Sequence, residues 1–388
     1  MKIHLHHVLA ILSLLFATFT LAFYFSISNT YIEDEDDAVH QKEKFFSQRV
    51  NACKRTSLSP LLFDKQAEKD KYILCKLGLT QYCIRRSPAE EQEYFYVVCP
   101  IYSVNQKAST LIYQLHTNFK YYCETLGVKF TQVEYAFPFQ DFILTKSGNE
   151  PYDIQIPGYN IFFLRENLVN VASKKLPDDY EYISWIDAHA YFDNPYVFQE
   201  TIVQLGKHNV VAPFSLVKFK DKTNSTSFGT QYPFVYQAYY SRGTPTMEVF
   251  PFYGLAFATK KHIFEKMNGL PDLCIAGICD VYMSLALTNG STIKNSEKLK
   301  ELKEVTNDWI ANAAKVIEGK FSYVKSTFTH FDHYFPLRKQ SDWGDAIRMM
   351  EARNFNVYKD LKRDKNGTLY FVDNFELADD FWKMYFAI

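Results

Sequence analysis

The chain has 388 residues, a formal net charge of −1 and a hydrophobic fraction of 47%. This is the composition of an ordinary globular protein with enough apolar mass for a sizeable core. Because the charge is balanced and no long basic block occurs, the composition gives no sign of nucleic-acid binding.

The first segment with a clear pattern is residues 8–27, "VLAILSLLFATFTLAFYFSI", which contain no charged side chain. As a helix this segment would span about 30 Å, the thickness of one hydrocarbon core. Lys2 precedes it and "IEDEDD" follows it, so the positive-inside rule leaves residues 1–7 in the cytosol. We expect a signal anchor with the rest of the chain in the lumen. A cleaved signal peptide is the alternative, and it predicts the same compartment.

Two further features agree with a lumenal location. Three N-glycosylation sequons occur, at Asn224, Asn289 and Asn366. Seven cysteines could form up to three disulfides in an oxidising compartment. Cys274 and Cys279 are close enough in sequence to pair, as are Cys75 and Cys83, and the spacings match no zinc-binding pattern.

Residues 28–90 are expected to form a lumenal stem. Their first part is acidic and polar, and "RRSPAEEQE" at residues 85–93 has the composition of a solvated linker. A folded domain is expected over residues 91–388.

Strand and helix patterns alternate from Tyr94 onward. Apolar and β-branched runs predict strands at 94–102, 128–137, 180–188 and 209–214. Helical periodicity predicts helices at 107–126, 160–176 and 194–206. In the last of these, Asn194 is expected as N-cap, with Pro195 at the first helical position and Gly206 as the stop. Residues 215–234 are expected to be a loop or lid. Such alternation predicts an α/β fold with a mainly parallel sheet and helices on both faces.

The third predicted strand ends in Asp187, and His189 follows two residues later. Ligands of open α/β sheets bind beyond the carboxyl ends of the strands. Alternation along a strand lets residues 187 and 189 point the same way, and a carboxylate beside an imidazole could hold a divalent cation. The alternative is a strand-end Asp that caps the next turn, with His189 packed beside it.

The segment "YISWIDAHAYFDNPYVFQETIVQL" resembles the Asp-x-Asp region of glycosyltransferases with the GT-A fold, closest to a group whose strand reads W-I-D-A-D. Further segments resemble that group in the same order, including "LRENLVNVASKKLP", "GLPDLCIAGICDVYMSLAL" and the C-terminal "THFDHYFPLRKQSDW". The last resembles its HG..KNR.Y motif, with Tyr334 where the group has Gly and with an insertion before the basic stretch. The resemblance covers residues 93–375. It implies a Rossmann-like GT-A fold and transfer of a sugar from a nucleotide-sugar donor.

The resemblance also implies a Mn²⁺ or Mg²⁺ ion that neutralises the leaving diphosphate. The matching positions are Asp187, His189 and His333. His189 replaces the second acid of the motif, which suits Mn²⁺ or Zn²⁺ better than Mg²⁺, or else marks a site that has changed or lost its metal. The alternative for His333 is a structural role, with its ring nitrogens hydrogen-bonded and its ring packed among aromatic side chains.

Asp280 matches the position of the general base that deprotonates the acceptor hydroxyl in an inverting displacement. Its alternative role is to complement a helix dipole from the first turn. For the donor, the resemblance implies Glu134 at the base or ribose, Arg165 and Asn167 at the diphosphate or sugar, and Lys339 in a basic stretch. The alternative for Glu134 is a solvated carboxylate at a strand end. The alternatives for Arg165 and Asn167 are a charge on the helix surface and an amide in the helix interior.

The leading hypothesis is a single-pass type II membrane glycosyltransferase of the Golgi or endoplasmic reticulum, metal-assisted and inverting. Its acceptor would be a glycan, glycoprotein or glycolipid. The second hypothesis is a non-catalytic lumenal binding or scaffold protein that keeps the fold with a degenerate metal site. A nucleotidyltransferase would need a glycine-rich phosphate loop after the first strand, and "CPIYSVNQKAS" has no glycine.

Overall fold

The computed structural model describes residues 88–102, 106–137, 140–159, 164–188, 190–221, 227–240, 256–273, 275, 279–288, 299–332, 342–373 and 375–385. The chain divides after Arg85 into two units, and all of these residues belong to the second, Arg86–Ile388. The cytosolic tail, the transmembrane anchor and most of the stem expected from the sequence lie outside the described residues. Within them, no helix is both long and apolar enough to cross a membrane.

A seven-stranded sheet forms the centre of this unit, in the order β10-β6-β9-β4-β1-β2-β3. The strands are β1 (Phe95–Tyr102), β2 (Lys129–Ala136), β3 (Asp153–Pro157), β4 (Tyr182–Ile186), β6 (Val210–Ala212), β9 (Ala256–Lys260) and β10 (Phe321–Tyr323). Only β9 among them runs antiparallel to its neighbours β4 and β6. The expected mainly parallel sheet is therefore confirmed, as are the four strands predicted in it.

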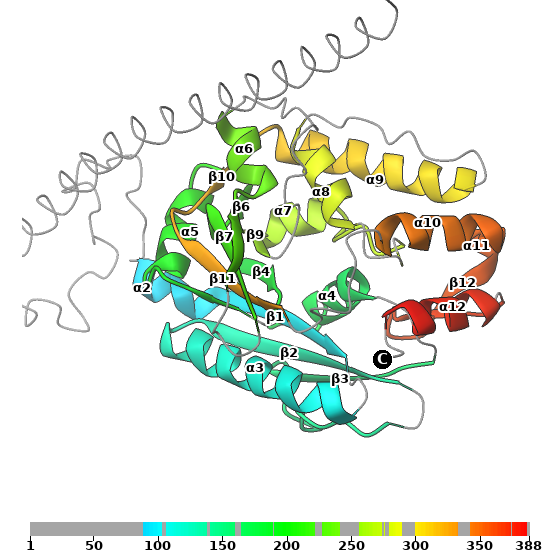
Figure 1. Cartoon of the computed structure of the whole chain (residues 1–388). Helices are drawn as coiled ribbons and strands as arrows, with labels where there is room; N and C mark the ends of the chain where they lie inside the picture. Colours follow the sequence, from blue (N-terminus) through cyan, green and yellow to red (C-terminus); the bar gives the residue numbers. More distant parts are fainter. Residues whose placement is uncertain are drawn as a thin grey trace, which may run out of the picture. The chain divides into compact units, whose positions relative to one another are not determined.

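Helices cover both faces of this sheet, as predicted. They include α3 (Gln106–Thr125), α4 (Arg165–Ser173), α5 (Val197–Leu205) and α7 (Lys261–Lys266). Phe95 and Trp185 belong to opposite faces, because Trp185 pairs with the residue three positions after Phe95. Phe95 packs on Phe198 of α5, with ring centroids 5.5 Å apart, and Trp185 packs on Phe264 of α7 at 6.1 Å. Figure 1 shows α3 and α4 on opposite sides of the sheet.

A second sheet has the order β5-β11-β7-β8. Its strands are β5 (Ala190–Phe192), β7 (Leu216–Asp221), β8 (Ser227–Gln231) and β11 (Thr327–Asp332). The loop expected at residues 215–234 is therefore wrong, because this segment contains β7 and β8. β7 pairs with β11, more than 100 residues away in sequence, and no local pattern reports such a partner.

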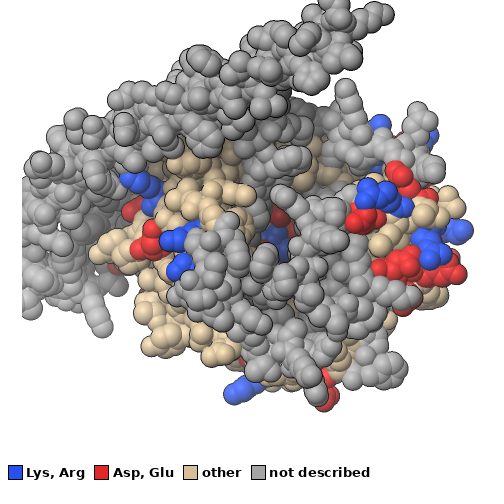
Figure 2. Space-filling view, viewed as in Figure 1, with Lys and Arg blue, Asp and Glu red and all other residues tan. Residues whose placement is uncertain are grey.

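The remaining described elements surround the two sheets. They are α2 (Pro88–Glu91), the 3₁₀ helix η5 (Gln92–Tyr94), α6 (Phe234–Tyr240), α8 (Cys279–Leu287), α9 (Lys300–Ile317), α10 (Asp342–Ala352), α11 (Val357–Asp360), α12 (Phe375–Tyr385) and the hairpin of β12 (Leu361–Arg363) and β13 (Leu369–Phe371). In the space-filling view, acidic and basic atoms lie side by side near the middle of this side (Figure 2).

The linker expected at residues 85–93 is wrong at its C-terminal end. Glu91 and Gln92 are each only 5% exposed. The Glu91 carboxylate accepts a hydrogen bond from the Tyr182 hydroxyl at 2.6 Å, and Gln92 Nε2 donates to the Leu126 carbonyl at 2.7 Å. The polar composition indicated solvent, but these polar groups find protein partners instead.

The start predicted for α5 also needs correction. The helix begins at Val197, and Asn194 is not its N-cap. Asn194 Oδ1 accepts a hydrogen bond from the Tyr196 backbone N–H at 2.8 Å, which forms an Asx-type turn over Pro195. The helix ends at Leu205 with Gly206 as its C-cap, so Gly206 is the stop, as predicted.

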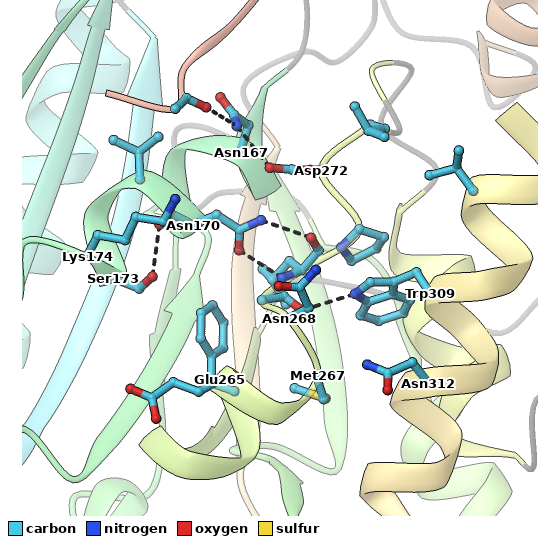
Figure 3. A pocket seen from close by; sticks show the side chains of 18 of the residues that line it. Asn167, Asn170, Ser173, Lys174, Glu265, Met267, Asn268, Asp272, Trp309 and Asn312 are labelled. Atoms are coloured by element: carbon cyan, nitrogen blue, oxygen red, sulfur yellow. Dashed lines mark hydrogen bonds between the residues drawn. The ribbon is translucent and has the colours of Figure 1, made fainter. Parts of the chain in front are cut away.

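An amide clamp fixes α4 to the turn that follows α7. The Asn170 side chain donates to the Leu270 carbonyl at 2.9 Å and accepts from the Leu270 N–H at 2.8 Å. From α9, Trp309 Nε1 donates to the Gly269 carbonyl at 3.1 Å. Figure 3 shows both side chains directed at this turn, beside a cavity of about 770 Å³ that they line. The clamp therefore holds α4, the helix that begins at the candidate site.

Gly269→Ala is expected to lower the free energy of unfolding by about 2–4 kcal/mol. Gly269 has φ 73°, and an added Cβ would lie 2.4 Å from Asn170 Oδ1, so the substitution strains the backbone and disturbs the clamp. The matched control is Asn268→Gly, at φ 64° on the preceding residue, for which we expect a change within about 0.5 kcal/mol. Urea unfolding of the two variants measures both, and equal midpoints would contradict the clamp.

Candidate functional site

Three segments meet beyond the carboxyl end of β4. Asp187 follows the last residue of β4 and, by alternation, lies on the same face as Trp185. Arg165 is the first residue of α4, on that face, and Asp280 lies in the first turn of α8. The predicted strand-end position of Asp187 and the predicted helix-start position of Asp280 are both confirmed.

The Arg165 side chain joins these segments and is only 7% exposed. Its Nε lies 2.8 Å from Asp187 Oδ1 in an ion pair. Its Nη1 donates to Glu166 Oε1 and to Asp280 Oδ1, each at 3.1 Å. One guanidinium therefore holds three carboxylates from three parts of the chain, which we call the Arg165 cluster.

The charges of the Arg165 cluster do not balance, since full ionisation would leave two carboxylates without a counter-charge. Burial raises the pKa of Asp280 to about 7; the Arg165 guanidinium opposes this rise, and the charges of Glu166 and Asp187 add to it. Burial also raises the pKa of Glu166. Arg165 in turn has its pKa raised by Asp187, Asp280 and Glu166 against the effect of its own burial. At neutral pH Asp280 is therefore only partly ionised.

The helix start at Arg165 is fixed by the end of β1. The Leu164 N–H donates to the Tyr102 hydroxyl at 2.7 Å, which satisfies one of the N–H groups that a helix leaves open at its start. The positive ends of the α4 and α8 dipoles both face acidic side chains of the cluster, Glu166 and Asp280. The dipole role considered for Asp280 is therefore compatible with a chemical role.

Glu134 lies in the core, with no exposed surface. Its Oε1 accepts from the Ile143 N–H at 2.7 Å. Its Oε2 accepts from the Leu144 N–H at 3.0 Å, and from the N–H and hydroxyl of Thr145 at 2.9 and 2.7 Å. The carboxylate anchors the loop after β2, so neither a nucleotide contact nor a solvated strand end describes it in this structure.

Asn167 is only 1% exposed and its amide is fully engaged. Nδ2 donates to Asp272 Oδ2 and to the Gly367 carbonyl, each at 3.0 Å, and Oδ1 accepts from the Leu369 N–H at 3.0 Å. Asp272 is itself held by Arg363 through two hydrogen bonds, of 2.7 and 2.8 Å. In this arrangement Asn167 fastens α4 to the β12–β13 hairpin. Arg165 likewise binds carboxylates of the chain, where the sequence led us to expect both side chains at the diphosphate or sugar.

Several predicted site residues lie outside the described residues: His189, His333, Lys339, Asn224 and Asn289. Asn366 is described and exposed in the turn between β12 and β13. Within the described ranges, no group of three or more His, Cys, Asp or Glu side chains could hold a metal ion. Described residues near His189 and His333 lie on neighbouring strands. Ala190, which follows His189, pairs with His330, three residues before His333.

Sequence reasoning missed Glu166 and Cys279. A first-turn glutamate is ordinary in any helix, so only its burial beside Arg165 distinguishes Glu166. Cys279 is a buried thiol that hydrogen-bonds Glu166. The pairing of Cys274 with Cys279 is therefore wrong in this structure, because the Cys279 sulfur serves the cluster instead. Cys75 and Cys83 lie outside the described residues.

Comparisons with known proteins give no match to a protein-family model and none to a curated protein. Among solved structures, the catalytic domain of Drosophila beta1,4-galactosyltransferase 7 in complex with xylobiose matches with 10% identity and a TM-score of 0.35, over 74% of this chain and 97% of that one. A mutant of that enzyme with manganese, UDP-Gal and xylobiose matches with 12% identity and a TM-score of 0.33, over 66% and 79%. A 4-diphosphocytidyl-2C-methyl-D-erythritol synthase from Anaerococcus prevotii matches with 12% identity and a TM-score of 0.32, over 68% and 98%. All three TM-scores lie below 0.5, so these similarities do not indicate which reaction the chain catalyses.

Proposed function

We propose that this chain is a GT-A-like glycosyltransferase that moves a sugar from a nucleotide-sugar donor to a hydroxyl acceptor. The observation that carries the proposal is the position of Asp280. Its pKa of about 7 suits a general base at neutral pH, and it lies beside Asp187 at the carboxyl edge of a mainly parallel sheet. The ordered resemblance of residues 93–375 to GT-A enzymes supports the choice of substrate class.

In the proposed reaction, Asp280 accepts the proton of the acceptor hydroxyl while that oxygen attacks the anomeric carbon of the donor. The nucleoside diphosphate leaves from the opposite side, so the configuration inverts. Arg165 keeps the Asp280 carboxylate in place through the 3.1 Å contact and is a positioning residue in this scheme. Side-chain exposure of 30% lets Asp280 reach an acceptor from solvent.

A divalent cation, Mn²⁺ or Mg²⁺, is part of the proposal and would be held by Asp187 with His189 and His333. When bound, it would neutralise the charge of the leaving diphosphate. Asp187 fits this role in part: its side chain is 33% exposed, and Oδ1 contacts Arg165. The pairing of Ala190 with His330 on neighbouring strands supports a convergence of the two histidines.

We also propose a location and partners. Residues 8–27 would anchor the protein as a single-pass type II membrane protein of the Golgi or endoplasmic reticulum. The acceptor would be a glycan, glycoprotein or glycolipid, and Asn366 would carry a glycan at its exposed turn.

One observation favours the second hypothesis, a non-catalytic lumenal binding protein. Arg165 already occupies the space between Asp187 and Asp280, where it acts as an internal counter-ion. A site neutralised in this way could keep the fold without binding a metal or turning over a donor.

Thermal unfolding of the full-length protein with Mn²⁺ and UDP separates the two hypotheses. Ligand binding to the folded state at about 100 times Kd adds about 2.7 kcal/mol, so an enzyme should show a clear rise in Tm. Asp187→Asn should reduce the rise, whereas Asp345→Asn, on the exposed side of α10, should leave it unchanged. A Tm that no nucleoside diphosphate raises, with no donor hydrolysis across UDP- and GDP-sugars, would leave the binding-protein hypothesis standing.

The stability of the fold should depend on pH through Asp280. Asp280 has a pKa of about 7 in the fold against 3.8 in the free side chain, so the folded state binds its proton more tightly than the unfolded state. The contribution of Asp280 to stability is therefore fully present below about pH 4, falls as the pH rises toward 7, and changes no further above that. Asp280→Asn should remove this decline while abolishing donor hydrolysis.

In the wild type, donor turnover should rise with pH through about 7 as Asp280 loses its proton. Glu166→Gln should move this rise in turnover to lower pH, because it removes a negative charge that raises the Asp280 pKa. Asp345→Asn, which removes an exposed carboxylate of α10, is the control and should leave the pH dependence of turnover unchanged. If Glu166→Gln leaves the pH of this rise in turnover unchanged, the Arg165 cluster does not control it.

Removing the Arg165 guanidinium tests how much its charge stabilises the fold. Arg165→Met leaves three neighbouring carboxylates without their counter-charge and is expected to lower stability by about 3 kcal/mol at pH 8. The control is Arg353→Met, whose ion pairs with Glu376 and Asp380 lie at the surface, where water and salt screen them, so its loss should be much smaller. Chemical denaturation measures both, and the loss at Arg165 should shrink at pH 5, where Asp280 is protonated.

A further inference from the structure

Five tyrosines gather where α6 packs against the end of β10, and we call them the tyrosine platform: Tyr232, Tyr236, Tyr239, Tyr240 and Tyr323. The Tyr236 ring lies at its centre, with centroid distances of 4.8 Å to Tyr232, 4.8 Å to Tyr240 and 5.0 Å to Tyr323. The Tyr239 ring stands edge-on to Tyr323 at 5.4 Å. The hydroxyls of Tyr240 and Tyr323 lie 2.7 Å apart and hydrogen-bond each other. The rings therefore brace one another in fixed orientations.

Three rings of the platform are nonetheless open to solvent. Tyr232, Tyr239 and Tyr240 are 45%, 43% and 52% exposed. A tyrosine presents an apolar ring and a polar hydroxyl at once, which is why it is enriched at binding surfaces. A braced group of such rings is pre-organised, so binding to it costs little side-chain entropy.

The position of the platform relates it to the Arg165 cluster. β10 runs parallel to β6, and both β6 and β4 run antiparallel to β9, so β10 and β4 point the same way. Tyr323 is the last residue of β10, and Asp187 follows the last residue of β4. Both therefore lie at the carboxyl edge of the sheet, three strand spacings apart, or roughly 14 Å. In Figure 1, α6 lies beside β10, and α6 also packs against α8, which carries Asp280.

We propose that the tyrosine platform is a subsite for the acceptor, and that the acceptor is a carbohydrate chain of several sugar residues. The C–H face of a sugar ring packs on an aromatic face, and its hydroxyls hydrogen-bond with phenolic oxygens. Each tyrosine of the platform supplies both kinds of contact, and the phenolic hydroxyls suit the hydroxyls of a sugar better than an apolar helix or an acyl chain. A chain seated there would reach along the sheet edge toward Asp280. This assignment rests on the proposed function.

The test measures oligosaccharide binding directly, independent of catalysis. Full-length protein is titrated with a panel of xylo-, manno-, chito- and galacto-oligosaccharides of two to six residues, with saturation-transfer NMR as the readout. We expect Tyr239→Ala and Tyr240→Ala each to weaken binding about tenfold, and Tyr240→Phe, which keeps the ring, to weaken it less. Tyr121→Ala, a 72% exposed tyrosine on α3, is the matched control and should bind as the wild type does.

The outcomes are distinct from those that test the proposed function. Binding that is lost in the Tyr239 and Tyr240 variants but kept in the Tyr121 variant, with unchanged Tm and an unchanged response to Mn²⁺ and UDP, supports the subsite. No oligosaccharide binding by the wild type, or equal binding by all variants, overturns it even where UDP binds. Platform-dependent oligosaccharide binding without any response to nucleotides would support the subsite while the glycosyltransferase proposal fails.

Discussion

The buried guanidinium of Arg165 is shared by Glu166, Asp187 and Asp280, and the arrangement of the carboxyl edge depends on this interaction. A single cation among three carboxylates cannot satisfy all of them in their charged forms. Burial, together with the charges of Glu166 and Asp187, raises the pKa of Asp280 to about 7 against the opposing effect of Arg165, so its ionisation is incomplete at neutral pH. The fold thus gives up some stability at this cluster, as the proposed role of Asp280 as a general base would require.

Such a cluster needs a rigid frame, because small displacements of a charged group change its interactions strongly. The frame here is made of amides. Asn167 fastens α4 to the β12–β13 hairpin, and Asn170 fastens it to the turn at Leu270. Both are on α4, within five residues of Arg165, so the helix that carries the guanidinium is held at its start and along its length. Glu134 plays a similar part for the loop after β2.

The direction of the strands then decides what can act together. All strands of the central sheet except β9 end at one edge, and this edge carries both the Arg165 cluster and the tyrosine platform. The proposed transfer of a sugar to a carbohydrate chain would use a general base and an extended acceptor subsite at this one edge. The residues of one feature are at least 40 positions from those of the other in the sequence, and the parallel order of the strands brings them to one side.

The sequence alone determined the α/β alternation, the strands β1, β2, β4 and β6 and the position of Asp187 at a strand end, because periodicity and burial are local properties. It also marked Arg165, Asn167, Glu134 and Asp280 as residues of interest. Their contacts came from the tertiary structure, which turned Glu134 and Asn167 into anchors and Arg165 into the shared counter-ion. It also paired β7 with β11 and gathered the tyrosines. These outcomes depend on partners distant in sequence, and a pattern read along the chain contains no information about which distant groups will share one charge.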